Sequence, residues 1–87
     1  MNIPSSSVAN EVREGYVLVR LRGEVDLSWS QAVRRAVLDA LAGDEPVGVD
    51  LSEVSYIDSS GIAALVEGFQ TARARGGRFA LVAVSDA

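Results

Sequence analysis

A carboxylate, two hydroxyls and a glycine follow one another at Asp58-Ser59-Ser60-Gly61, between an apolar lead-in and an amphipathic segment. Serine beside aspartate is compatible with a helix cap, a catalytic nucleophile, an anion-binding turn, or a hydroxyl that another protein modifies. Each of these four interpretations requires different residues elsewhere in the chain. The remaining sequence therefore tests them.

The basic residues of the chain argue against the catalytic interpretation. The 87 residues include no histidine and no cysteine, and all eight basic residues are arginines. A Ser-His-Asp triad and a Ser-Lys dyad are therefore both excluded. Asp58 is a poor base for Ser59, because neighbouring side chains on a turn rarely point toward each other. We expect no catalytic residue, and the chain is not predicted to be an enzyme.

Ligand binding at the same turn is also disfavoured. A Walker-type phosphate loop needs a lysine, and Asp58 would repel an anion held at the start of a helix. The acidic residues are dispersed along the chain, without the spacing of a metal site. We therefore expect no metal and no cofactor.

The charge and hydropathy of the chain limit the classes of partner that it is expected to bind. The formal net charge is −4 and the isoelectric point is near 4.6, which disfavours nucleic acid and anionic membrane surfaces. No apolar run approaches the ~20 residues needed to span a bilayer, and the first ten residues do not form a secretory signal. The absence of cysteine fits a reducing compartment. We expect a cytoplasmic protein with no nucleic-acid or membrane partner.

The apolar pattern predicts the element order β-β-α-β-α-β. We expect a loose segment at residues 1–7, followed by one α/β domain at residues 8–87 with a mixed sheet of about four strands and two main helices. The predicted strands cover residues 8–13, 16–23, 47–51 and 78–84. A turn is expected at residues 52–55. The first helix is expected to start at Ser28 or Ser30, and the second at the serine pair.

Packing can be predicted for several apolar residues. Trp29 is expected to pack in the core or against the helix cap, with an exposed partner anchor as the less favoured role, and Tyr56 is expected to pack beneath a loop. The apolar face of the second helix is predicted to comprise Ile62, Leu65, Val66, Phe69 and Ala72. The last strand is apolar up to the end of the chain, so we expect a sheet edge without a neighbour. A homodimer formed through the incomplete sheet is one way to supply the missing neighbouring strand.

Residue types alone leave two interpretations of the serine pair open. Serine and aspartate are favoured helix caps, which explains one hydroxyl well and the second less well. Gly61 is a poor helix former, so we expect it to leave the backbone open to an approaching molecule. A phosphoryl group would add about −1.5 to −2 charges and gain from the helix dipole, although Asp58 would repel it.

Three segments carry a resemblance to a known family. "GEVDL", "VDLSEVSYIDSSGIAALV" and "GGRFALVAVS" resemble the STAS domain, and more specifically the bacterial anti-sigma factor antagonists. The resemblance covers nearly the whole chain. It implies that Ser59 is phosphorylated by the anti-sigma factor, a serine kinase that uses ATP. It also implies that a metal-dependent serine phosphatase removes the phosphate.

The resemblance further implies a partner-binding site around Ser59. Asp58 would flank the acceptor, and Ser60, Gly61 and Ile62 would continue the presented surface. Glu24 and Asp26 would lie near that turn. Family members usually continue past the fourth strand, so we expect the family's C-terminal elements to be missing here.

Two functions follow from the resemblance. In the first, the unphosphorylated chain binds a serine-kinase anti-sigma factor and thereby frees a sigma factor, and phosphorylation ends the contact. In the alternative, the chain is a structural STAS subunit of a larger complex, such as a lipid-transport assembly or a stress-signalling scaffold. The serines would then serve only as caps and contacts.

Overall fold

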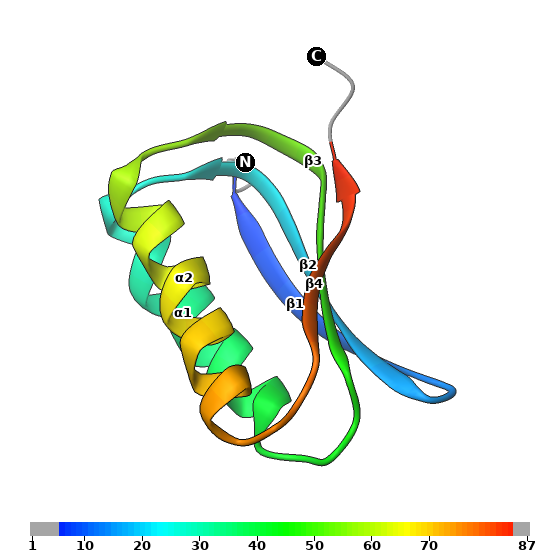
Figure 1. Cartoon of the computed structure of the whole chain (residues 1–87). Helices are drawn as coiled ribbons and strands as arrows, with labels where there is room; N and C mark the ends of the chain where they lie inside the picture. The colour runs from blue at the N-terminus through cyan, green and yellow to red at the C-terminus, as the bar shows by residue number, and fades with distance from the viewer. Residues whose placement is uncertain (1–5, 85–87) are drawn as a thin grey trace.

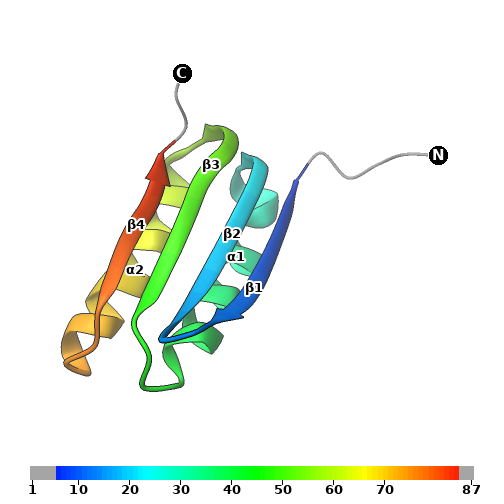
Figure 2. The same ribbon diagram turned by 90° about the vertical axis from the view of Figure 1, so that its right-hand side faces the viewer.

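Two helices cover one face of a four-stranded sheet and leave the other face open (Figures 1 and 2). The computed structural model describes residues 6–84. The elements are β1 (Ser7–Arg13), β2 (Tyr16–Val25), α1 (Leu27–Leu41), β3 (Val47–Ile57), α2 (Ser59–Ala74) and β4 (Phe79–Val84). The strand order is β1-β2-β3-β4, in which β1 is antiparallel to β2 and the other pairs are parallel. The predicted mixed α/β fold is confirmed.

The N-terminal hairpin turns at Gly15, whose φ of 88° suits glycine. Its first strand begins at Ser7, and Ser6 is already buried. The Ser6 hydroxyl donates to the Glu24 carbonyl oxygen (2.7 Å) and accepts from the Glu24 N–H (3.1 Å). Ser6 and Ser7 are thus tied to β2, whereas a loose segment was expected up to residue 7. Residues 1–5 lie outside the described part of the chain.

The turn expected at residues 52–55 is wrong, because β3 is one strand from Val47 to Ile57. Its polar stretch stays paired with β2, for example at Arg22 with Glu53. Irregular register in that stretch lets the strand bend without leaving the sheet. Tyr56 consequently lies on a strand and is 55% exposed, so it does not pack beneath a loop.

The core lies between the sheet and the helices. Its largest fully buried side chains come from β2, β3 and α1: Val19, Leu21, Val33, Val37, Val47 and Val49. Trp29 is only half-buried, and it is not among the side chains that form or pack against the described core. Of the predicted roles, packing in the core is therefore wrong, and packing against the helix cap stays a prediction.

The buried face of α2 differs from the predicted one. Leu65 and Ala72 are buried, but Ile62, Val66 and Phe69 are each about half exposed. The helix is turned so that its small residues Gly61, Ala64 and Gly68 face inward. Small side chains allow the backbones of packed elements to approach closely, so the position of α2 is set by its glycines and alanine as much as by its large apolar residues.

The two helices pack closely against each other at Gly68. A Cβ atom there would collide with Cγ1 of the fully buried Val37 on α1. We expect Gly68→Val to lower the free energy of unfolding by ~2 kcal/mol through overpacking. Gly77→Ala is a matched control, because its Cβ would meet only the Ala72 carbonyl oxygen at 3.6 Å, an ordinary contact. Urea unfolding of both variants checks this, and equal stabilities would contradict it.

Candidate functional site at the helix N-termini

Both helices begin at the same end of the sheet, where β2 and β3 end (Figure 1). These two strands are parallel, and Val25 pairs with Ile57 at their last residues. The N–H of Asp58 donates to the carbonyl oxygen of Val25 (3.1 Å). The two strand-to-helix junctions are therefore held directly side by side.

The two junctions use the same capping arrangement. Asp26 caps α1 by accepting from the Ser28 N–H (3.0 Å) and the Ser28 hydroxyl (2.6 Å). Asp58 caps α2 by accepting from the Ser60 N–H (3.0 Å) and the Ser60 hydroxyl (2.6 Å). Both helices thus begin with an Asp-x-Ser cap.

The predicted start of α1 is therefore corrected. Asp26 is the cap, whereas Ser28 or Ser30 was expected. Ser28 lies in the first turn and donates to the cap carboxylate. Ser30 is buried, and its hydroxyl donates to the Leu27 carbonyl oxygen (3.1 Å). Asp26, two residues before Ser28, is favoured because its carboxylate is the stronger acceptor and gains from the helix dipole.

The two serines of α2 are chemically different. Ser60 is partly buried and its hydroxyl is committed to Asp58. Ser59 is exposed, and within residues 6–84 its hydroxyl makes no hydrogen bond to the protein. A hydroxyl that is free and exposed can be reached by another molecule, whereas the Ser60 hydroxyl must first leave its acceptor.

Asp58 is held in its ionised form. The pKa of its carboxyl group lies below the usual value of 3.8, firstly because of the Ser60 hydroxyl and then because of the Gly61 N–H. The N–H groups of Ser60 and Leu27 lower the pKa further. Leu27 belongs to α1, so the start of the other helix also contributes to the low pKa of Asp58. A carboxylate saturated with donors is a weak base, so Asp58 cannot activate Ser59 by removing its proton.

Gly61 has a different role from the one expected. It is buried, and a Cβ atom there would lie 2.8 Å from Ile57 Cγ1, Val25 Cγ1 and the Val25 carbonyl oxygen. The glycine thus allows the start of α2 to pack against the end of β2. It does not open the backbone to an outside molecule.

The structure brings the other predicted site residues to the same end of the fold. Glu24 is exposed near the end of β2, opposite Tyr56, and Asp26 starts α1. Ile62 lies in the first turn of α2, 50% exposed, and its N–H donates to the Asp58 carbonyl oxygen (3.0 Å). All six predicted partner-binding residues thus surround the Ser59 junction.

One residue of this surface was not predicted from the sequence. Leu27 is 74% exposed and occupies on α1 the position that Ser59 occupies on α2. The signal that could have found it is the repeated Asp-x-Ser pattern at residues 26–28 and 58–60.

Hollows lie on several sides of the helices. One of about 330 Å³ runs between α1 and α2 from Leu27 and Ser60, and Arg34 and Glu67 line it further along. A second, of about 470 Å³, lies between α2 and β4 and is lined only by apolar residues and alanine. The third, of about 440 Å³, is at the opposite end of both helices.

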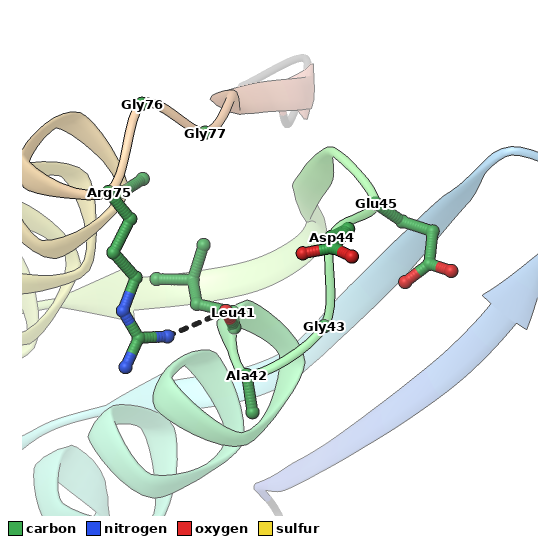
Figure 3. Close-up of a pocket in the computed structure, with 9 residues that line it drawn as sticks. Leu41, Ala42, Gly43, Asp44, Glu45, Arg75, Gly76 and Gly77 are labelled. Carbon is green, nitrogen blue, oxygen red and sulfur yellow. Dashed lines mark hydrogen bonds between the residues drawn. The ribbon is translucent and has the colours of Figure 1, made fainter.

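The third hollow lies far from Ser59, and its residues contribute to the fold. Figure 3 shows Arg75 reaching from the end of α2 to the last turn of α1, where it donates to the Leu41 carbonyl oxygen (2.8 Å). No basic residue lies in the last turn of α1 itself. Arg75 therefore supplies the cation that complements the negative end of this helix.

The described residues also bear on metal binding and on membrane insertion. Residues 6–84 contain no cluster of three or more acidic side chains that could hold a metal ion. None of the helices in this part of the chain is both long and apolar enough to cross a membrane.

The fold and the site together define a small α/β domain that presents a free serine hydroxyl at a helix start. The model of the STAS domain family matches residues 7–87, and the chain belongs to this family.

Several solved structures are similar. An anti-sigma factor antagonist from Mycobacterium paratuberculosis is 27% identical, with a TM-score of 0.79, and the match covers 95% of this chain and 72% of that one. The anti-sigma factor antagonist SpoIIAA in its unphosphorylated form is 25% identical, with a TM-score of 0.75 and coverage of 92% and 72%. The Bacillus cell fate determinant SpoIIAA in its phosphorylated form shares the fold, at 24% identity, a TM-score of 0.69 and coverage of 84% and 68%.

The lowered pKa of Asp58 predicts an acid-dependent stability. A carboxyl group with a depressed pKa stabilises the fold above its unfolded pKa, and this stabilisation is lost as the pH falls through the folded value. Asparagine still caps a helix but carries no charge. We expect wild type to exceed Asp58→Asn in free energy of unfolding at pH 7, and the difference to shrink toward about pH 2.

The measurement is urea unfolding of both proteins across this pH range. Asp44→Asn is the control, because within the described residues the Asp44 side chain makes no hydrogen bond, and it lies exposed beyond the end of α1. A wild-type advantage that stayed constant down to pH 2 would contradict the described role of the Asp58 carboxylate.

Proposed function

We propose that this protein is an anti-sigma factor antagonist that works as a phosphorylation-controlled binding switch. Unphosphorylated, it binds a serine-kinase anti-sigma factor, which then releases its sigma factor. Phosphorylated at Ser59, it dissociates, and a metal-dependent serine phosphatase restores the binding form. The observation that carries this proposal is the exposed Ser59 hydroxyl, which makes no hydrogen bond within residues 6–84, beside a Ser60 hydroxyl that is bonded to Asp58.

The comparisons support this proposal. The chain belongs to the STAS domain family, and two of its structural relatives are described as anti-sigma factor antagonists. One relative, SpoIIAA, has been solved in an unphosphorylated and a phosphorylated form. Of the two serines at the start of α2, Ser59 is the one whose hydroxyl suits the same modification.

In the proposed reaction, the chain is a substrate. The Ser59 Oγ atom attacks the γ-phosphorus of ATP, the bond from this phosphorus to the bridging oxygen breaks, and ADP leaves. The hydroxyl proton passes to a base on the kinase, because the hydrogen bonds that Asp58 accepts as a cap lower its pKa and make it a weak base. The contribution of this protein is positioning, which is a large part of catalysis in phosphoryl transfer. Removal of the phosphate is hydrolysis by a water that the phosphatase's metal activates.

The switch acts through charge at the partner-facing end. A phosphoryl group brings about −1.5 to −2 charges to a surface that already holds Glu24, Asp26 and Asp58. None of these three carboxylates forms an ion pair within the described residues. Burying this charge against the kinase requires desolvation, which opposes binding.

The fold is expected to change little on phosphorylation. The N–H groups of Ser60 and Gly61, which a phosphate at a helix start would otherwise recruit, already donate to Asp58. The phosphate therefore projects from the surface and does not rebuild the start of α2.

Phosphate transfer tests the assignment of the acceptor. Each serine-kinase anti-sigma factor encoded in the source genome would be purified and incubated with ATP and the protein. With the cognate kinase, intact mass should show one added phosphate for wild type and Ser60→Ala, and none for Ser59→Ala. Equal phosphorylation of Ser59→Ala at Ser60 would contradict the assignment. No phosphate on wild type with any of these kinases would favour the structural subunit instead.

Added charge tests the switch. Ser59→Asp should bind the cognate kinase at least about tenfold more weakly than wild type, a loss of ~1.4 kcal/mol, whereas Ser59→Ala should bind normally. Gln70→Glu is the control, since it adds the same charge to an exposed position about three turns further along α2. Isothermal titration measures all three. Equal weakening by Gln70→Glu would assign the effect to net charge and contradict a local switch.

A further inference from the structure

We propose that Leu27 is a specificity-determining residue, which contacts the kinase next to its ATP site and helps to select it. This inference rests on the proposed function, because it concerns the enzyme that modifies Ser59. The observation behind it is the pairing of the two helix starts. Leu27 and Ser59 each follow a capping aspartate directly, on helices that begin side by side.

Leu27 adjoins the phosphate acceptor. The N–H of Asp58, which directly precedes Ser59, donates to the carbonyl oxygen of Val25 (3.1 Å), two residues before Leu27. The hollow between the helices also begins at Leu27 and Ser60. The backbone of Leu27 is thus part of the junction, while its side chain is 74% exposed and outside the described core.

The fold does not explain a leucine at this position. A side chain so exposed contributes little to stability, and any residue except proline would supply the backbone N–H of Leu27, which helps to lower the pKa of Asp58. Exposure alone assigns no role, since Val12 is 84% exposed at the hairpin. Leu27 differs from Val12 in its position beside the acceptor.

The geometry of phosphoryl transfer brings the kinase into contact with Leu27. The kinase must enclose the Ser59 hydroxyl, align it with the γ-phosphate and exclude water. A surface that encloses Ser59 also covers its flanks, which are Leu27 on α1 and Ile62, 50% exposed, on α2. Both flanking side chains are apolar, so their burial favours binding without a requirement for matched polar groups.

The complementary feature on the kinase is an apolar pocket beside its ATP site. The hollow between α1 and α2, about 330 Å³, gives room for the wall of such a pocket next to Leu27. The ion pair between Arg34 and Glu67 (2.5 Å) bridges the two helices further along this hollow. A kinase with a polar or charged surface at this point would leave Leu27 in contact with unpaired polar groups and would be rejected.

Steady-state phosphorylation by the kinase that modifies wild type tests this. We expect Leu27→Ala to raise the KM for the protein about tenfold, ~1.4 kcal/mol, with kcat within about twofold of wild type. Leu27→Met, which keeps a long apolar side chain, should restore KM to within about threefold. Val12→Ala is the matched control and should not change KM. The melting temperature of Leu27→Ala should equal that of wild type.

Each outcome decides the inference. An unchanged KM for Leu27→Ala, with wild type still phosphorylated at Ser59, would overturn the role of Leu27 and leave the proposed function intact. A lower kcat with unchanged KM would mean that Leu27 acts by positioning Asp58, which also overturns it. If no purified kinase transfers phosphate to wild type, the proposed function and this inference fail together.

Discussion

The carboxylate of Asp58 is the interaction on which the site depends. It accepts the N–H and hydroxyl of Ser60 and the N–H of Gly61, and the N–H of Leu27 on the other helix also lowers its pKa. This single side chain therefore follows β3 and caps α2 beside the start of α1. It also separates the two serines, because it engages one hydroxyl and leaves the Ser59 hydroxyl in solvent.

The rest of the fold serves to bring this carboxylate to the neighbouring helix. Parallel pairing of β2 with β3 places their last residues together, and Asp58 continues that pairing through the Val25 carbonyl oxygen. Gly61 allows α2 to begin in contact with β2, where any side chain would collide. At the other end, Arg75 joins the C-terminal turns of the two helices. The helix pair is thus fixed at both ends, which keeps Ser59 in one position for an enzyme that must reach it.

Much of this could be predicted from the sequence, and the errors have physical causes. Local patterns predicted the element order and the Ser59 junction, since apolar periodicity and Asp-Ser caps depend on near neighbours. The turn predicted at residues 52–55 failed because polar residues also occur on the open face of a strand. The roles of Gly61 and Leu27 depend on contacts between the two junctions, which are about thirty residues apart in the chain. Periodicity within one helix does not report such contacts.

The influence of the α1 start on the Asp58 carboxylate can be measured directly by NMR. A titration of the Asp58 carboxyl carbon in acid should give a pKa below 3.8, and the amide protons of Ser60, Gly61 and Leu27 should shift with the same midpoint. The Leu27 amide is decisive, because it belongs to the other helix. If the Leu27 amide does not follow the titration, or if Asp58 titrates at or above 3.8, the carboxylate is not coupled to the start of α1. The account of how Ser59 is presented would then be wrong.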